Sequence, residues 1–275
     1  IEIAVGSGMD EDDAPSLEWP SILPVLPLKN TVLFPHVLSP LLVNTQRSQA
    51  LIDDVLVRPE RMLVAAAVLD PSLEGSPGPD EIYRVGTVLR VVKMLKFPDQ
   101  SYRLLVQGVG RVAIGDFEVA DAFMRAHVVA IEEEGDYDSV EMTALMRNVT
   151  GQFASLVSES NRLSDELQLI AANVEDPSQL ADMLAHHLDF DVAGKQKVLE
   201  EPEVAERLKR VLSQINKENA ALQLETEIKD KVQSEMGRTQ RDYVLRQQLE
   251  AIRRELGESD EGEEGTEDLR VRVEQ

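Results

Sequence analysis

The residue types that most often carry chemistry are scarce in this sequence, and their spacing does not form a site. There is no Cys, which excludes thiolate metal sites, disulfides and Cys nucleophiles. The four histidines are His36, His127, His186 and His187. None stands at the H-E-x-x-H spacing that brings two imidazoles and a Glu to one zinc ion. We therefore predict that the histidines lie on the surface or pack in the core, with no catalytic and no metal-ligating residue in this chain.

Clustered carboxylates and one Gly-Lys pair are the remaining candidates for chemistry. The runs Asp53-Asp54 and Glu132-Glu133-Glu134 could act as acid and base or hold a metal ion. No Gly-rich scaffold surrounds them, which favours solvated surface positions. Gly194-Lys195 lacks the earlier glycine of G-x-x-x-x-G-K-[ST] and is followed by Gln196, so it cannot cradle phosphates as a P-loop does. The sequence predicts no cofactor-binding residue.

Apolar residues in or near expected loops are stronger candidates, because an exposed apolar patch marks a protein-binding surface. We predict a polypeptide-binding surface formed by Phe34, Pro35, Val37, Leu38, Met94, Leu95 and Phe97. The alternative for each of them is packing in the core. A basic run lies on neighbouring expected strands and comprises Arg84, Arg90, Lys93, Lys96 and Arg103. It alternates with apolar residues, which favours the solvent face of a hairpin over an RNA-binding patch.

Three residues of an expected long helix are candidates for contacts with other chains. Met236, Tyr243 and Leu249 could touch a neighbouring subunit or a translocating polypeptide. The alternative is that they pack on a helical bundle of the same chain. The sequence leaves both interpretations open.

The overall charge excludes several classes of partner. The 275 residues include 51 acidic and 28 basic side chains, a formal net charge of −23. Binding to nucleic acid or an anionic membrane needs clustered Lys and Arg, so neither is expected. No apolar run approaches the roughly 18 residues of a membrane span, and the acidic first segment is unlike a signal or transit peptide. We expect a cytoplasmic protein without a membrane partner.

The charge is uneven along the chain, and such shifts often mark domain boundaries. Residues 23–130 hold eleven acids and eleven bases, whereas residues 131–200 hold fifteen acids and four bases. We predict five segments: an acidic disordered tail at 1–22, a β domain at 23–131, a helical bundle at 138–200, a long helix at 203–257 and an acidic linker at 258–275.

The neutral segment indicates β-structure, because its apolar runs are short, β-branched and separated by turn residues. Met62–Val68 is expected to be a fully buried strand, since its apolar residues do not alternate with polar ones. The clearest hairpin joins Val85–Lys96 to Tyr102–Gly108 through Pro98–Ser101. The other expected elements are Pro24–Leu28, Pro40–Val43, a short helix at Ser48–Val57, and strands at Val109–Val119 and Met124–Ile131. Together they predict a small mixed barrel or curled sheet.

The later segments indicate helices, which makes the fold class α+β. Apolar residues recur at helical spacing from Met142 to Val157. Ser164 is expected to cap a second helix, and Asp176-Pro177 to begin a third with an acceptor at the cap and Pro at the first position. A fourth short helix is expected at Val192–Leu199. From Glu203 to Leu256 there is no Pro and one Gly, which predicts a long helix that contacts different partners along its length.

Three separated stretches resemble one known family. Leu26–Pro35, with the sequence LPLKNTVLFP, resembles the opening of the Lon protease N-terminal domain. Lys195–Glu200 and Glu206–Leu208 resemble the helical subdomain of that family. Gln240–Glu258 is similar to its signature on the long helix that leads into the ATPase module. The resemblance covers about Leu23 to Glu258, in the order that the family has.

The resemblance implies a PUA-like β-barrel, a helical bundle and a long helix, as in the N-terminal region of bacterial-type ATP-dependent Lon proteases. Such a region would bind unfolded or degron-bearing polypeptides for degradation in protein quality control and would assemble into a homohexamer. The family's AAA+ ATPase, with its ATP and Mg, and its Ser-Lys protease module have no counterpart in this sequence. Two alternatives stay open: this chain as part of a complete ATP-dependent serine endopeptidase, or a stand-alone LON-domain adaptor or chaperone without ATPase activity.

Overall fold

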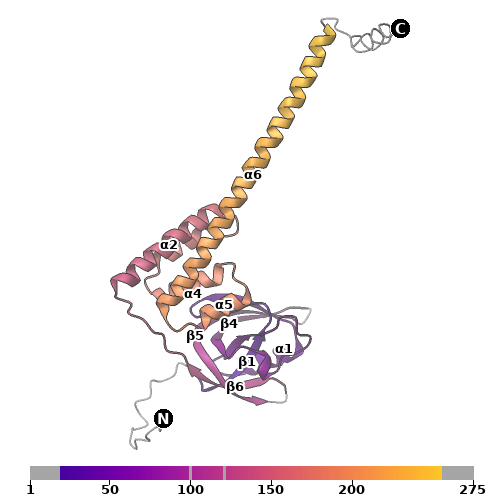
Figure 1. Cartoon of the computed structure of the whole chain (residues 1–275). Helices are drawn as coiled ribbons and strands as arrows, with labels where there is room; N and C mark the ends of the chain where they lie inside the picture. The colour runs from indigo at the N-terminus through magenta and orange to yellow at the C-terminus, as the bar shows by residue number, and fades with distance from the viewer. Residues whose placement is uncertain (1–18, 99–100, 120–121, 256–275) are drawn as a thin grey trace, which may run out of the picture. The chain divides into compact units, whose positions relative to one another are not determined.

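The computed structural model describes residues 19–98, 101–119 and 122–255 (Figure 1). Strands come first along the chain and helices follow. The strands are β1 (Ile22–Leu28), β2 (Leu38–Val43), β3 (Met62–Ala67), β4 (Val85–Lys96), β5 (Tyr102–Val119) and β6 (Met124–Ala130). The helices are α1 (Gln46–Val57), the 3₁₀ turn η1 (Pro79–Glu81), α2 (Val140–Glu159), α3 (Asp165–Asn173), α4 (Pro177–His187), α5 (Val192–Leu199) and α6 (Val204–Glu255).

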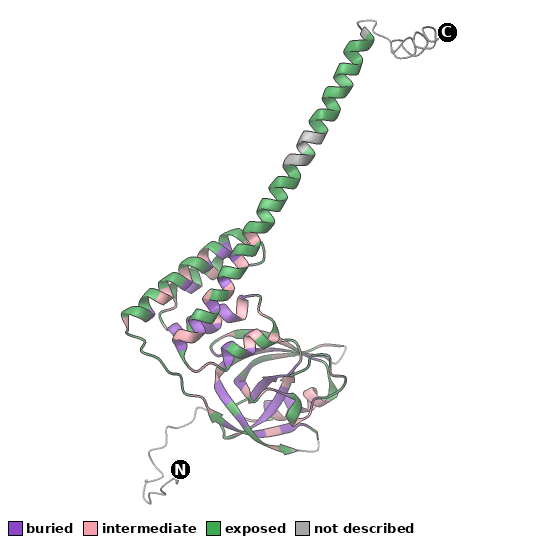
Figure 2. Cartoon of the chain, in the orientation of Figure 1, coloured by how far each residue is buried: buried purple, intermediate pink, exposed green. Residues whose placement is uncertain are grey.

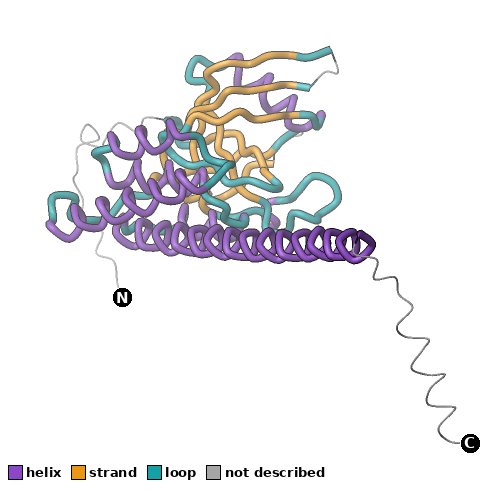
Figure 3. The backbone as a smooth tube through the Cα atoms, turned by 90° about the horizontal axis from the view of Figure 1, so that it is seen from above, coloured by secondary structure: helices purple, strands orange, loops and turns teal. Residues whose placement is uncertain are grey.

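The six strands form one mixed sheet that closes nearly into a ring. Their order is β2-β5-β4-β3-β1-β6, and β5 also pairs with β6. The β1–β3 pair is parallel, and the other pairs are antiparallel. Figure 3 shows the strands gathered beside the helices of the bundle. The predicted α+β class, with a mixed barrel-like sheet before the helices, is confirmed.

Strand β3 is buried on both faces, as its unbroken apolar run predicted. Leu63 and Ala65 belong to an apolar cluster that includes Leu51, Ile52 and Val55 of α1. Val64 and Ala66 belong to a second cluster, with residues of β4, β5 and β6. Helix α1 thus covers one face of this part of the sheet, and the curled sheet covers the other.

Strand β5 is a single element of 18 residues, whereas the sequence predicted two strands that divide after Gly108. The strand continues through Gly108, and the glycine is needed there because a neighbouring loop packs closely against the strand. His36 N–H donates to the Gly108 carbonyl and Gly108 N–H donates to the Val37 carbonyl, each at 3.0 Å. A Cβ atom on Gly108 would overlap the backbone of Phe34. Gly108 therefore permits a close backbone approach and does not end the strand.

The helix starts follow from local capping. Ser164 accepts a hydrogen bond from Glu166 N–H at the start of α3. Asp176 accepts from two backbone N–H groups at the start of α4, where Pro177 is the first helical residue. Both predicted starts are confirmed, because a cap and its helix are close in sequence.

Helix α6 has 52 residues and is divided between two compact units, one ending at Asn219 and the other beginning at Ala220. In the first unit Val204, Leu208, Val211 and Ile215 are fully buried against the bundle. In the second unit the described side chains, apart from the half-buried Leu222, are exposed (Figure 2). The apolar seam that the sequence indicates is therefore covered at its first four positions only. The predicted end of this helix, at residue 257, lies outside the described residues.

Candidate functional site

The outer face of β2, β5 and β4 carries an exposed apolar surface. Leu42 of β2 pairs with Arg103 of β5, and Arg103 pairs with Leu95 of β4. Side chains directly opposite one another on paired strands share one face, so these three form a row. Two further rows follow at steps of two residues, Pro40 with Leu105 and Lys93, then Leu38 with Gln107 and Arg90. We call these nine residues the sheet surface.

Three leucines and Pro40 of the sheet surface are open to solvent, whereas Leu105 is half-buried. Leu38 is 54%, Leu42 58% and Leu95 50% exposed. Val92, at an irregularity in the β4–β5 register beside these rows, is 48% exposed. Large aliphatic side chains grouped in this way are typical of a surface that binds another polypeptide.

Cationic side chains are interleaved with these apolar groups. Arg90, Lys93 and Arg103 are exposed, and none of them lies within 4 Å of a carboxylate of the residues that the structure describes. Arg103 stacks over the Phe97 ring at 4.3 Å, and Lys96 lies 5.3 Å from the Tyr102 ring. Arg84, the first residue of the basic run, instead forms an ion pair with Asp80 at 3.2 Å. The sheet surface therefore combines aliphatic groups with positive charge.

The seven predicted polypeptide-binding residues do not all reach this surface. Leu38 and Leu95 belong to it, and half-buried Phe97 borders it beneath Arg103. Phe34 is 1% exposed and Pro35 is buried, because the segment that holds them packs across β5 at Gly108. The other two predicted residues, Val37 and Met94, are half-buried.

Sequence reasoning missed Leu42 and Val92. For Leu42 the signal was available, since Pro40–Val43 was expected to be a strand and alternate residues of a strand point to opposite faces.

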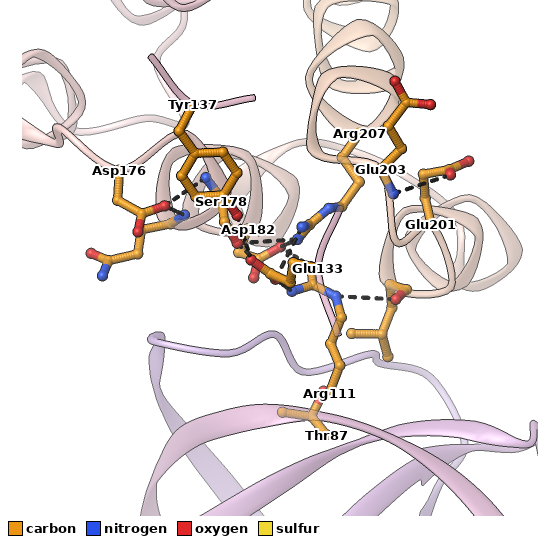
Figure 4. A network of polar contacts seen from close by, with 12 residues as sticks. Thr87, Arg111, Glu133, Tyr137, Asp176, Ser178, Asp182, Glu201, Glu203 and Arg207 are labelled. Atoms are coloured by element: carbon orange, nitrogen blue, oxygen red, sulfur yellow. Dashed lines mark hydrogen bonds and ion pairs between the residues drawn. The ribbon is translucent and has the colours of Figure 1, made fainter. Parts of the chain in front are cut away.

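A buried network of charges joins the sheet to the helical bundle (Figure 4). Arg111 of β5 and Arg207 of α6 both donate to Asp182 of α4. The side chain of Arg111 is 2% exposed, and those of Arg207 and Asp182 are 0% exposed. Glu133, from the segment between β6 and α2, lies 2.6 Å from Arg111 Nη1 and 3.0 Å from Arg207 Nη2. Two cations and two carboxylates thus balance one another, and of the four side chains only that of Glu133, at 28%, is appreciably exposed.

Further hydrogen bonds fix the same junction. Ser178 donates to Glu133 at 2.8 Å, and Arg111 Nε donates to the carbonyl of Leu199 at 3.2 Å. Gln196 of α5 donates to the carbonyl of Val85 in β4 at 3.0 Å. The segment between β6 and α2 also pairs with the segment before α6, since Glu134 N–H donates to the Pro202 carbonyl and Val204 N–H to the Glu134 carbonyl, each at 2.9 Å. These contacts hold the bundle in one orientation on the sheet.

The electrostatics of the network follow from burial and charge. Burial alone would raise the pKa of Glu133, but the Ser178 hydroxyl and the charges of Arg207 and Arg111 outweigh it and the pKa is lowered. Burial raises the pKa of Asp182, and the two arginines oppose that shift. Burial, followed by the charge of Glu133, raises the pKa of Tyr137 to about 12. These shifts accompany a structural junction between the sheet and the bundle.

The long-helix candidates are exposed in the second unit. Met236 is 69%, Tyr243 62% and Leu249 53% exposed. They belong to a larger set of exposed apolar residues on α6 that includes Leu224, Ile228, Val232, Leu245 and Ile252. Their predicted contacts with other chains therefore stay a prediction, made on side chains that are open to such contacts.

The structure gathers no metal-ligating cluster from the predicted acids and histidines. Among the described residues, no group of three or more His, Asp and Glu side chains could hold a metal ion. Asp53 and Asp54 lie on α1, where Asp54 forms ion pairs with Arg58 and Arg125. His186 and His187 lie at the C-terminal end of α4. No described helix is long and apolar enough to cross a membrane.

Comparisons with known proteins agree on one family. A family model described as the ATP-dependent protease La (LON) substrate-binding domain matches residues 22–217. The chain is similar to the Lon protease of Dictyoglomus thermophilum, with 36% identity over 93% of this chain and 32% of the relative. It is also similar to the Lon protease of Rhizobium meliloti, with 36% identity over 91% of this chain and 31% of the relative. The chain thus spans about a third of the length of these curated relatives.

Solved structures show the same fold. The N-terminal domain of the Mycobacterium avium complex Lon protease superposes with a TM-score of 0.60 at 20% identity, over 71% of this chain and 98% of that one. A Lon N-terminal domain protein from Xanthomonas campestris superposes with a TM-score of 0.51 at 20% identity, over 70% of this chain and 98% of that one.

Proposed function

The chain belongs to the family of ATP-dependent protease La (Lon) substrate-binding domains, and on that premise we propose that it is the substrate-recognition region of an ATP-dependent Lon-type serine protease. In this proposal it binds unfolded or degron-bearing polypeptides for degradation in protein quality control. Cleavage and ATP hydrolysis belong to other modules of the complete enzyme, and this region contributes binding and assembly.

The observation that carries the proposal is the sheet surface. Leu38, Leu42 and Leu95 are each at least half exposed, although aliphatic side chains of this size usually lie inside a soluble domain. An unfolded polypeptide offers the apolar side chains that a native protein hides, and it can cover such a surface without a fixed sequence. The interleaved cations favour client segments that also carry carboxylates.

The test is a binding measurement with two matched variants. Leu42→Asp and Val129→Asp each place one carboxylate on an exposed strand position, but Val129 lies on β6, outside the sheet surface, and is 65% exposed. Reduced and alkylated α-lactalbumin serves as the unfolded client. We expect Leu42→Asp to weaken its binding about tenfold or more, because burial of one aliphatic side chain is worth about 1.5–3 kcal/mol, while Val129→Asp binds like the parent chain. Equal binding by both variants would remove the sheet surface from client recognition.

We further propose that the exposed apolar residues of α6 contribute to assembly of subunits into a homohexamer. The supporting observation is that Leu224, Ile228, Val232 and Met236 recur at steps of four and stay exposed on one helix. A stripe of this kind can pack against another helix. Sedimentation velocity of the chain and of its Ile228→Asp variant tests this role. Loss of the associated species is expected, and an unchanged distribution would refute it.

A further inference from the structure

A second feature adjoins the sheet surface at Leu42, a cavity of about 440 Å³ between β1 and β2. Strand β1 pairs with β6 only through Ile22–Pro24 and with β3 through Val25–Leu28. The edge of β1 opposite β3 therefore has no described strand partner beyond Pro24. The cavity opens beside this edge and is bounded by the end of β2, the first turn of α1 and the loop at Gly75–Pro77.

The walls of this cavity are largely aliphatic and aromatic. Leu51 of α1 and Phe123 line it and belong to the buried core, and Leu41 of β2 packs against that core. A volume of this size lies within the range of about 300–1,000 Å³ that is typical of small-ligand sites. It suits the end of a chain or a single side chain better than a long extended segment.

The charges that line the cavity are all positive. The chain as a whole has 51 acidic and 28 basic residues. Yet none of the residues that line the cavity is Asp or Glu, and two are basic, Lys29 and Arg47. Lys29 is held at the loop by a hydrogen bond from Nζ to the Leu73 carbonyl at 2.6 Å. Arg47 is half-buried, and among the described residues no carboxylate lies within 4 Å of it.

Arg47 also stands where a cation is locally unfavourable. It is the second residue of α1, after the cap Thr45, and the first turn holds no acidic residue. The positive end of the helix dipole disfavours a cation at this position and favours an anion. Local rules of this kind are broken most often at functional sites. The guanidinium and the helix therefore present positive potential to the same cavity.

From these contacts we propose that the cavity binds the C-terminal residue of a client polypeptide, an apolar residue that carries the free α-carboxylate. The assignment rests on the proposed role in binding polypeptides. It follows from chemistry: a ligand for this cavity must unite an apolar group with a negative charge in a small volume. Within a polypeptide, an internal Leu or Val has no charge and an internal Asp or Glu has no aliphatic side chain. A C-terminal Leu or Val has both.

The experiment uses fluorescein-labelled peptides of one sequence that differ only at their last residue, and measures their binding to the full chain by anisotropy. The three peptides end in Leu with a free carboxylate, in Leu with an amide, and in Lys with a free carboxylate. We expect the first to bind about tenfold or more tightly than the second, since a charge-assisted hydrogen bond is lost in the amide. The Lys peptide is expected to bind weakly, because its side chain brings a positive charge to Lys29 and Arg47.

Two chain variants locate the effect. Arg47→Gln should reduce binding of the Leu carboxylate peptide to the level of its amide, whereas Arg147→Gln, at an exposed position of α2, should leave binding unchanged. Equal affinities for carboxylate and amide on the parent chain would overturn the proposal. A carboxylate preference that survives Arg47→Gln would overturn it as well.

The same variants separate this proposal from the proposed function. Leu42→Asp adds a carboxylate to a residue that borders the cavity, so Leu95→Asp on β4 is used for this comparison. If unfolded α-lactalbumin loses affinity for Leu95→Asp but the peptides show no carboxylate preference, the sheet surface stands and the cavity proposal fails. If the carboxylate preference holds and α-lactalbumin binds Leu95→Asp like the parent chain, the cavity proposal stands and the role of the sheet surface fails.

Discussion

Asp182→Ala is expected to be among the most destabilising single substitutions at the junction of sheet and bundle. Asp182 is 0% exposed and accepts hydrogen bonds from both buried arginines, Arg111 and Arg207. Without it, the two guanidinium groups share Glu133 as their remaining carboxylate, and one positive charge is buried without compensation. Breaking a buried charge pair in this way costs about 3–5 kcal/mol. That is a large part of the roughly 5–15 kcal/mol by which domains are stable.

The assay is urea denaturation followed by two probes. Trp19 is the only Trp of the chain and packs against an apolar cluster of the sheet, so its fluorescence reports on the sheet. Circular dichroism at 222 nm reports mainly on the helices. Asp80→Ala is the matched control, because it breaks the ion pair with Arg84, in which both side chains are more than half exposed. An exposed pair of this kind contributes at most about 1 kcal/mol.

The reasoning fails if Asp182→Ala lowers the free energy of unfolding by no more than Asp80→Ala does. A second comparison tests whether an unpaired buried charge is the cause of the destabilisation by Asp182→Ala. Replacing Asp182, Arg111 and Arg207 by Leu, Met and Met, together with Glu133→Gln, removes all four charges, and apolar replacement of a complete buried network is often neutral. The quadruple variant should therefore be more stable than Asp182→Ala. A quadruple variant that is less stable would show that lost packing, and not an unpaired charge, explains the single substitution.

Three further predictions concern the rest of the fold. Burial, with the charges of His187 and Lys195, lowers the pKa of His186 to about 4, so the unfolded chain binds this proton more readily and stability falls as the pH is lowered from about 6.5 toward 4. His186→Gln should reduce the loss of unfolding free energy between pH 7.5 and pH 5 by about 1–2 kcal/mol, a figure that allows for the exposed part of the ring. Urea midpoints at the two pH values measure this loss, and the same loss in the variant and the parent chain would contradict the prediction. Gly108→Ala should destabilise the sheet by about 2 kcal/mol or more in the same urea titration, since its Cβ would overlap the backbone of the loop at Phe34. An unchanged free energy of unfolding would refute the close packing of this loop against β5. Asp176→Ala should cost about 1 kcal/mol through loss of the α4 cap, whereas Asp176→Asn should largely retain stability.

The elements that were predictable from sequence are those whose signals are local. The start of α4 at Pro177 and the whole of α5 were predicted at the correct residues, because a cap and the helix that it begins are neighbours in sequence. The burial of β3 was predictable from its own composition. Gly108 misled the prediction of β5, because the loop that requires a glycine there comes from residues 34–37, far earlier in the chain.

The candidate sites were predictable only in part, for a related reason. Leu38 and Phe34 are both apolar and lie close together in sequence, but packing of the loop across β5 at Gly108 buries Phe34, while Leu38 stays exposed. The charge network was missed entirely. Arg207 gave a signal, since it lies on the same helical face as Val204 and Leu208, and a charged residue on an apolar stripe needs a partner. Its partners come from two distant segments, α4 and the segment after β6, and only the folded chain identifies them.

The charge network also has a mechanical consequence. Arg207 lies within the first turn of α6, and Val204 at the start of that helix is bonded through its backbone to Glu134, in the segment that leaves the sheet. A tensile load applied along α6 would therefore pass into the sheet through several bonds in parallel, the ion pairs at Asp182 and Glu133 and the backbone pairing at Glu134. Bonds loaded in parallel must break together, which makes this junction a stiff anchor for the start of the helix.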